Sequence, residues 1–225
     1  KLVKGLFFAG QINGTTGYEE AACQGLMAGI NAHLQAKEAT PFILSRSEAY
    51  IGVLIGDLIN KGTEEPYRMF TSRAEYRILL RQDNADLRLT EMGYRLGLAD
   101  KDRYEAVIQK KQAIQAIKNY FAEYQVSPED INGFLQSVGT ADIKQKQKLE
   151  KIITRPQVQL ADLRKALPEL DSFLSKQGSA AAESAEIELK YDAYIQKEHE
   201  MVEKIGKLEN IKLDTDFDYG TIKSL

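Results

Sequence analysis

The stretch Asp100–Tyr124, DKDRYEAVIQKKQAIQAIKNYFAEY, carries the helical signal on which the fold class rests. Its apolar side chains recur three, four or seven residues apart, which places them on one side of an α-helix. These side chains are Val107, Ile114, Ile117, Phe121 and Tyr124. Either Asp100 or Asp102 can cap the first turn by accepting a backbone hydrogen bond. We therefore predict a long helix that ends near Tyr124 and buries one face in a core.

Helical signals continue toward the C-terminus. The sequence Ser127-Pro128-Glu129-Asp130 combines a capping serine with proline at the first helical position. Further short helices follow, and Pro156 and Pro168 interrupt them. Residues 177–183 are rich in alanine, serine and glycine and are predicted to form a mobile loop. A last helix is predicted over 183–209. Its expected core residues are Ile187, Tyr191, Tyr194, Ile195, Val202 and Ile205.

The residues that precede the long helix also favour helices. After Ser45 and Ser47, which can cap, a run of apolar residues keeps helical spacing until Gly62. The predicted buried face of this helix consists of Ile51, Leu54, Ile55, Leu58 and Ile59. A second helix is expected over 72–81 and a short one over 91–96. From residue 45 onward the chain is therefore predicted to be mainly α-helical.

The N-terminal residues favour a strand, a loop and a helix. Residues 6–9 are a short apolar run that stops at Gly10, and this pattern is typical of a buried strand. A helix is predicted from Tyr18 to about Leu34, with Thr15 or Thr16 as its cap. A glycine-containing loop before a helix leaves backbone N–H groups and the positive helix end free for an anion. The loop does not match the dinucleotide-binding pattern Gly-x-Gly-x-x-Gly.

The composition excludes several classes of protein. The 225 residues carry a formal net charge of −3, with 43% hydrophobic and 28% charged residues, as in ordinary soluble proteins. A single cysteine, Cys23, excludes an intramolecular disulfide framework. Two histidines, His33 and His199, cannot form a multi-histidine metal site. No apolar run approaches the roughly 20 residues that a membrane-spanning helix needs.

Arginine is concentrated in one part of the chain. Eight of the ten arginines lie between Arg46 and Arg103, and lysine dominates elsewhere. Arg73, Arg77 and Arg81 are spaced by four, so on a helix they share one face. The interleaved aromatic residues, which could stack on bases, are Tyr67, Phe70 and Tyr76.

Two interpretations of these arginines remain open. Four arginines and one acid between Arg68 and Arg81 give a local charge of +3, which suits phosphate binding. From Arg46 to Arg103, however, ten basic residues face ten acidic ones, which favours a solvated or ion-paired helix face.

Three stretches carry a resemblance to a known family. They are GLFFAGQINGTTGYEEAA at 5–22, EPYRMFTSRAEYR at 65–77 and RQDNADLRLT at 81–90. The sequence resembles the large flavoprotein subunit of the tRNA uridine carboxymethylaminomethyl modification complex, the glucose-inhibited division protein A family. The resemblance is strong over about 1–100 and thinner beyond, with echoes at 154–156 and 187–191.

The resemblance implies an activity and a set of partners. It implies an enzyme that uses FAD, NADH and a folate one-carbon donor to modify the wobble uridine of tRNA. It further implies a GTPase partner, a homodimer and a cytoplasmic location. The implied cofactor-binding residues are Gly10, Gln11, Asn13 and Gly14, and the implied tRNA-binding residues are Arg68, Arg73, Arg77 and Arg81. Cys23 does not match the catalytic cysteines of the family, so no catalytic residue and no metal ligand is assigned.

The resemblance also implies a domain organisation. Residues 1–44 correspond to the incomplete C-terminal edge of an α/β FAD-binding domain, which keeps only a strand, a loop and a helix. Residues 45–225 correspond to an α-helical domain that contacts tRNA and partner proteins. The chain is thus expected to be a mainly α C-terminal portion of a longer protein. Because the Rossmann half is absent, the isolated chain is expected to hold no FAD and to be inactive.

Two alternatives to this assignment remain open. The related folate- and FAD-dependent tRNA uridine methyltransferase is similar around Phe8-Ala9-Gly10-Gln11 but lacks the patterns at 13–16 and 67–70. In the other alternative, the chain is a non-catalytic helical scaffold for dimer and partner contacts, with no RNA contact of its own.

Overall fold

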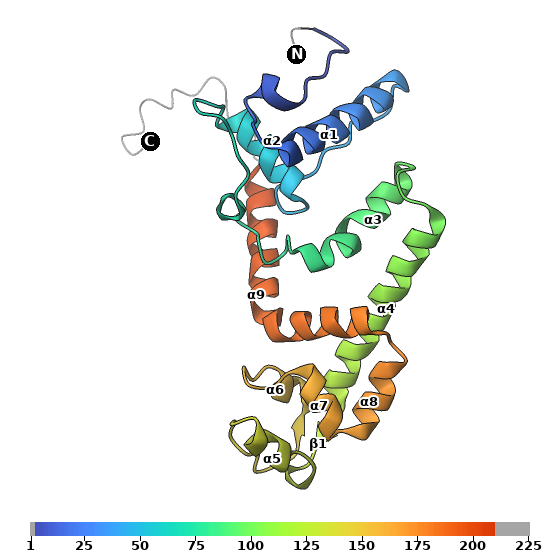
Figure 1. Cartoon of the computed structure of the whole chain (residues 1–225), viewed down its shortest axis with the longest axis vertical. Coiled ribbons are helices and arrows are strands. Elements are labelled where there is room, and N and C mark those ends of the chain that lie inside the picture. Colours follow the sequence, from blue (N-terminus) through green and yellow to red (C-terminus); the bar gives the residue numbers. More distant parts are fainter. Residues whose placement is uncertain (1–2, 210–225) are drawn as a thin grey trace.

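The computed structural model describes residues 3–209 and is mainly α-helical (Figure 1). This confirms the predicted fold class. The helices are α1 (Tyr18–Ala36), α2 (Tyr50–Asn60), α3 (Ala85–Arg95), α4 (Lys101–Glu123), α5 (Pro128–Ser137), α6 (Leu149–Ile153), α7 (Leu160–Ala166), α8 (Pro168–Ser175) and α9 (Ser179–Glu209). Short 3-10 helices span Gly10–Asn13, Thr71–Arg73 and Gln82–Asn84. The two-residue strands β1 (Gln125–Val126) and β2 (Gln147–Lys148) pair antiparallel.

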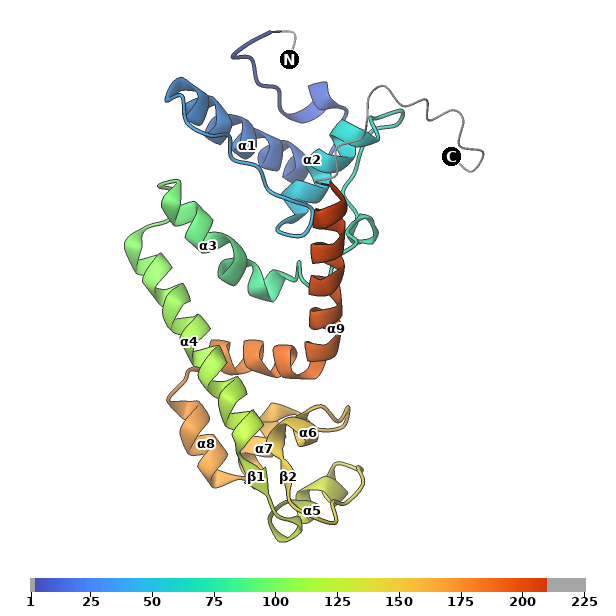
Figure 2. The ribbon, with the colours of Figure 1, turned by 180° about the vertical axis from the view of Figure 1, so that it is seen from behind.

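The larger hydrophobic core lies where α4 packs with α5–α8 and the start of α9 (Figures 1 and 2). This part of the molecule is called here the lower body. The long helix predicted within residues 100–124 is confirmed as α4. Asp100 caps α4 by accepting the N–H of Arg103 at 2.8 Å. The predicted face of α4 is buried at Val107, Ile114, Ile117 and Phe121.

The start of α5 also follows the sequence signal. The Ser127 side chain and the Asp130 side chain each bond the other's backbone N–H, which forms a capping box. Pro128 occupies the first helical position, where the missing N–H costs nothing. Local sequence was sufficient here because all partners lie within one turn.

The last helix begins earlier than predicted and buries other residues, although it reaches the predicted Glu209. The predicted loop at 177–183 is wrong, because α9 begins at Ser179. Alanine is the strongest helix former, and Ala181, Ala182 and Ala185 are small enough to bury against the lower core. The predicted core positions farther along are largely wrong, since Tyr194 is 61% exposed. There α9 bends away from the lower body and runs up to α2 (Figures 1 and 2).

Residues 3–17 do not form the predicted strand. Residues 6–9 are irregular and lead directly into the 3-10 helix at Gly10–Asn13. A strand needs a neighbouring strand for its backbone hydrogen bonds, and within residues 3–209 none lies beside this run. The predicted helix that follows is confirmed as α1, but its cap is Gly17 without a side-chain bond. Thr15 instead donates its hydroxyl to the carbonyl of Gly10 at 3.0 Å.

Helix α2 is present, and its predicted buried face is confirmed only in part, at Leu54. Val53, Leu54 and Asp57 are buried, whereas Ile59 is 75% exposed. Gly52 lies on the buried side of α2, where an added Cβ would lie 2.0 Å from the carbonyl oxygen of Ser45. The absence of a side chain at Gly52 lets α2 lie directly against the preceding turn.

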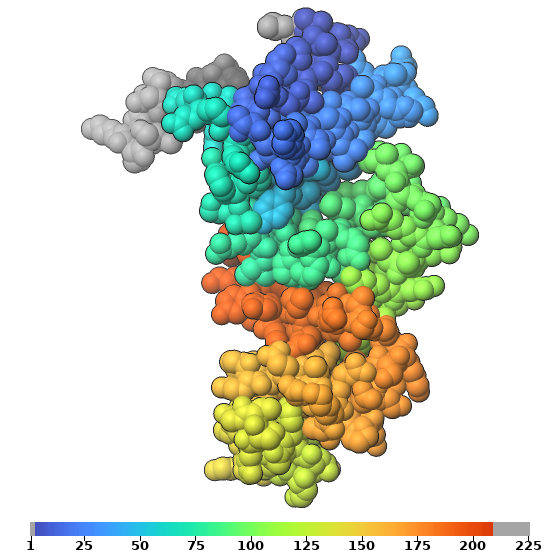
Figure 3. All heavy atoms as spheres, in the orientation of Figure 1, coloured from blue at the N-terminus to red at the C-terminus, as the bar shows by residue number. Residues whose placement is uncertain are grey.

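The predicted helix over 72–81 is wrong. One 3-10 turn at Thr71–Arg73 is followed by turns, and Tyr76, Leu79 and Leu80 are buried along this irregular path. The N–H of Leu79 donates to Glu198 of α9 at 3.2 Å, a partner 119 residues away. Figure 3 shows that α9 also lies between parts of the chain that are distant from it in sequence. Its orange atoms form a band between the green α3–α4 region and the yellow lower body.

Candidate functional site

A loop of residues 10–17, called here the N-terminal loop, is held on α1 by one buried side chain. Gln24 accepts the backbone N–H of Gly10 at 3.2 Å and the Asn13 amide at 2.7 Å. It donates in turn to the hydroxyl of Thr15 at 2.9 Å. Sequence reasoning missed Gln24, although its spacing with Glu20 and Met27 marks the inner face of α1. Gln24 therefore fixes the shape of the loop.

Three of the four predicted cofactor-binding residues line an open cavity of about 1180 Å³. These are Gln11, Asn13 and Gly14, whereas Gly10 is buried behind them. The remaining wall is mostly apolar and includes Phe7, Phe8, Ile12, Met27, Phe42, Ile43, Leu44, Ile55, Leu58 and Ile59. Within residues 3–209 the Gln11 side-chain amide has no hydrogen-bond partner. The cavity thus offers a free amide beside a broad apolar surface.

Glycine is required at one point of this wall. Gly14 has a φ of +76°, and an added Cβ would lie 2.5 Å from the Thr63 hydroxyl. Its carbonyl accepts the backbone N–H of Tyr67 at 2.7 Å. The turn at Gly14 is therefore what joins the N-terminal loop to residues far along the chain.

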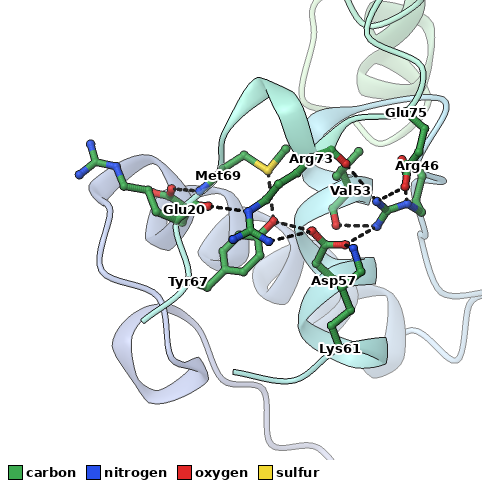
Figure 4. Close-up of polar contacts among 10 residues, drawn as sticks. Glu20, Arg46, Val53, Asp57, Lys61, Tyr67, Met69, Arg73 and Glu75 are labelled. Carbon is green, nitrogen blue, oxygen red and sulfur yellow. Dashed lines mark hydrogen bonds and ion pairs between the residues drawn. The ribbon is translucent and has the colours of Figure 1, made fainter. Parts of the chain in front are cut away.

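The segment at residues 67–81, called here the arginine segment, lies directly against the N-terminal loop (Figure 4). Besides the contact of Tyr67 with Gly14, the N–H of Met69 donates to the Glu20 carboxylate at 2.7 Å. Glu20 is 5% exposed, and this N–H, more than the positive charge of Arg68, lowers its pKa. No local pattern predicts this junction, because Glu20 and Met69 are 49 residues apart.

Asp57 is the centre of the polar network behind the arginine segment (Figure 4). Only 1% of Asp57 is exposed, and it accepts hydrogen bonds from Arg46 at 2.8 Å and from the Tyr67 hydroxyl at 2.9 Å. Lys61 lies 2.9 Å and Arg73 3.9 Å from the same carboxylate. Burial alone raises the pKa of Asp57, but the bonds from Lys61, Arg46 and Tyr67 outweigh it and lower the pKa. Asp57 is therefore held as a carboxylate.

The four predicted tRNA-binding arginines fall into two pairs. Arg73 lies 4.6 Å over the ring of Tyr67, near Asp57. Arg81 pairs with Asp83 at 3.1 Å and donates to a backbone carbonyl at 2.7 Å. Arg68 and Arg77 are exposed. Because the segment is not a helix, the four side chains do not share a helical face.

Cys23 is half-buried, and burial first, then the charges of Glu20 and Glu19, raise the pKa of its thiol. This keeps the sulfur protonated at neutral pH. In the described part of the chain no cluster of three or more side chains could hold a metal ion. None of the helices within residues 3–209 combines the length and apolar character needed to cross a membrane.

Comparison with family models defines the class of protein. Residues 101–199 match a model described as "tRNA modifying enzyme MnmG/GidA C-terminal helical domain". Residues 1–40 match one described as "Glucose inhibited division protein A". The chain therefore resembles MnmG/GidA proteins both at its N-terminal residues and in a C-terminal helical domain, as the sequence resemblance implied.

Known relatives match along the whole chain. Proteins from Cytophaga hutchinsonii and Parabacteroides distasonis, both named "tRNA uridine 5-carboxymethylaminomethyl modification enzyme MnmG", are 54% and 52% identical to it. The crystal structure of Aquifex aeolicus GidA in form II superposes with a TM-score of 0.79 at 41% identity. All of this chain is matched, and it covers 36%, 37% and 34% of these three proteins.

The chain belongs to the MnmG/GidA family and spans about a third of the length of its relatives. This assignment favours the resemblance to the glucose-inhibited division protein A family over the methyltransferase alternative.

Proposed function

We propose that this chain is part of an FAD-dependent enzyme that, with a GTPase partner, adds a carboxymethylaminomethyl group to the wobble uridine of tRNA. The names of the relatives support the reaction. The observation that carries the proposal is the junction between Gly14 and Tyr67 and between Glu20 and Met69. These bonds hold the N-terminal loop and the arginine segment side by side. An enzyme that modifies RNA with a bound cofactor needs such an arrangement, because the surface that contacts the cofactor must adjoin the surface that contacts the RNA.

The N-terminal loop is proposed to form one wall of the flavin site. Gln11, Asn13 and Gly14 line the cavity, and Gly10 shapes the turn behind them. When bound, FAD supplies the redox chemistry of the modification, with NADH as the reductant. The free Gln11 amide and the apolar wall suit the polar edge and the flat face of a flavin ring. Residues 1–44 are proposed to be the edge of that FAD-binding domain.

The isolated chain is expected to hold no flavin. The chain contains no Gly-x-Gly-x-x-Gly pattern, so it lacks the backbone cradle that usually grips the pyrophosphate. One wall is not enough, because ligand sites bury most of the ligand surface. The absorbance spectrum of the purified chain, compared with that of the complete protein, tests this. A flavin band at one equivalent in the isolated chain would contradict the prediction.

Residues 45–225 are proposed to provide the contacts with tRNA and with the GTPase, in a cytoplasmic homodimer. Among the arginines, the exposed pair Arg68 and Arg77 is available for phosphate. Arg73 and Arg81 are proposed to contribute from positions that their acidic partners fix. A protein of net charge −3 needs such a local positive surface to hold a polyanion.

Replacement of Arg77 by alanine in the complete protein is expected to weaken the binding of different tRNA species to a similar degree. Phosphate contacts carry no sequence information, so the preference among tRNAs should not change. The slope of log affinity against log salt concentration should fall by about 1 if one phosphate contact is lost. Titrations of tRNA at several salt concentrations measure this.

The thermal midpoint of the same variant separates binding from structure. Arg77 is exposed, so the midpoint should stay at the wild-type value. Arg73→Ala provides the contrast, because it removes the cation over Tyr67 and should lower the midpoint. A lowered midpoint with an unaltered salt slope for Arg77→Ala would assign Arg77 a structural role instead.

A further inference from the structure

The start of the arginine segment alternates between buried and exposed side chains. Tyr67 is 5% exposed and Met69 is half-buried, whereas Arg68 is exposed and Phe70 is 55% exposed. The backbone at Phe70 is extended, with φ −114° and ψ 148°. Successive side chains of an extended chain point to opposite sides. Arg68 and Phe70 therefore point outward from the same face.

Four contacts fix this register. The Tyr67 N–H donates to Gly14 at 2.7 Å, and its hydroxyl donates to Asp57 at 2.9 Å. The same hydroxyl lies 3.3 Å from the sulfur of Met69, whose N–H is bonded to Glu20. A shift by one residue would break all four contacts and bury the guanidinium of Arg68. The outward position of Phe70 is therefore imposed by the fold.

The structure also decides which aromatic side chain can meet a ligand. Of the three aromatic residues of this segment, Tyr67 and Tyr76 are buried at 5% and 6% exposure. Only Phe70 presents its ring to solvent. A large exposed ring beside an exposed arginine is the combination that proteins use for unpaired RNA, where the ring stacks on a base and the cation holds the phosphate.

We infer that Phe70 stacks on an unpaired base of the tRNA anticodon loop while Arg68 holds an adjacent phosphate. The inference rests on the proposed function and adds a base-contacting residue to it. It suits a substrate base that lies in a single-stranded loop, because the faces of such bases are accessible for stacking. Phe70 has no hydrogen-bonding group, so it contributes affinity for unpaired loops without reading the base identity.

The test uses the complete protein with Phe70 replaced by alanine, leucine or tryptophan. The probes are an anticodon stem-loop RNA and a blunt RNA duplex of the same length. Phe70→Ala is expected to lose about fivefold or more in affinity for the stem-loop, from the loss of one stacked base. Phe70→Leu should lose a similar factor because it lacks a π face, and Phe70→Trp should keep wild-type affinity. None of the three should bind the duplex differently from wild type.

Salt dependence and stability complete the design. Phe70→Ala removes no charge, so its salt slope should equal that of wild type, whereas Arg68→Ala should lower the slope by about 1. The thermal midpoint of Phe70→Ala should not fall. The inference is overturned if Phe70→Ala binds the stem-loop as wild type does, if Phe70→Leu restores affinity, or if the duplex is weakened equally.

The same measurements keep the two proposals apart. If wild-type protein binds the stem-loop and Arg68→Ala weakens it while Phe70→Ala does not, the stacking inference fails and the proposed function stands. If the wild-type complete protein binds no tRNA, the proposed function fails and the inference fails with it.

Discussion

Asp57→Ala is expected to lower the free energy of unfolding by about 3 kcal/mol, the lower end of the range for breaking a buried ion pair, because Asp57 is buried but its partner Arg46 is 26% exposed. Asp57 is 1% exposed, and its loss removes the one buried carboxylate that Arg46 and the Tyr67 hydroxyl share, whereas Arg46 keeps its ion pair with Glu75 at 2.6 Å. Because Tyr67 also pairs with Gly14, the N-terminal loop should loosen with it. Chemical denaturation of wild type and variant measures the loss. A change below about 1 kcal/mol would show that Asp57 contributes no more than a surface ion pair, since such pairs rarely exceed that value.

The pH dependence of stability provides the control for the charge of Asp57. Its pKa is lowered in the folded protein, so its carboxylate stabilises the fold above the ordinary carboxyl pKa of about 4. That stabilisation is lost as the pH falls through the folded pKa. Asp57→Asn keeps the shape but not the charge, so its stability should decline less steeply in acid. Equal acid slopes for Asp57→Asn and wild type would place the acid sensitivity elsewhere, for example at Glu75, whose pKa is also lowered.

Gly52→Ala is expected to lower the free energy of unfolding by about 3 kcal/mol, the upper end of the usual range for overpacked cores. The added Cβ would lie 2.0 Å from the carbonyl oxygen and 2.5 Å from the carbonyl carbon of Ser45. These atoms belong to the backbone, so no side chain can move to make room. Helix α2 would have to shift away from the turn and would take Asp57 with it.

Gly133→Ala in α5 is the matched control for Gly52→Ala. Gly133 is exposed, and an added Cβ there meets no atom within 4 Å. Alanine favours helix over glycine by roughly 0.5–1 kcal/mol, so this change should stabilise the protein. Calorimetric midpoints of the two variants should therefore move in opposite directions. Similar midpoints for both would show that the contact of α2 with Ser45 yields easily.

Local patterns were sufficient wherever the partners of a residue are close in the chain. The α4 prediction was correct because the periodicity of its apolar residues and the cap at Asp100 are contained within the helix itself. The capping box at Ser127 was found for the same reason. The predominance of helix after residue 45 follows from many such local signals, since each helix closes its hydrogen bonds within four residues.

Periodicity failed where burial depends on a distant element. It assigned Ile59 to the core of α2 and Tyr194 to the core of α9, yet both are mostly exposed. An apolar side chain can line one face of a helix, but only the tertiary packing decides whether another element covers that face. The side of α2 that carries Gly52 packs against the turn at Ser45, and the second half of α9 lies away from the lower core.

The sequence alone determined that this protein is mainly helical, that its glycine loop precedes a helix, and that arginine gathers between Arg46 and Arg103. Only the tertiary structure decided what those arginines do. Whether a guanidinium is paired with Asp57, like that of Arg46, or exposed, like those of Arg68 and Arg77, depends on acids far away in the chain. The physical reason is that side-chain type records which interactions a residue can make, whereas long-range packing determines which partner is within hydrogen-bonding distance.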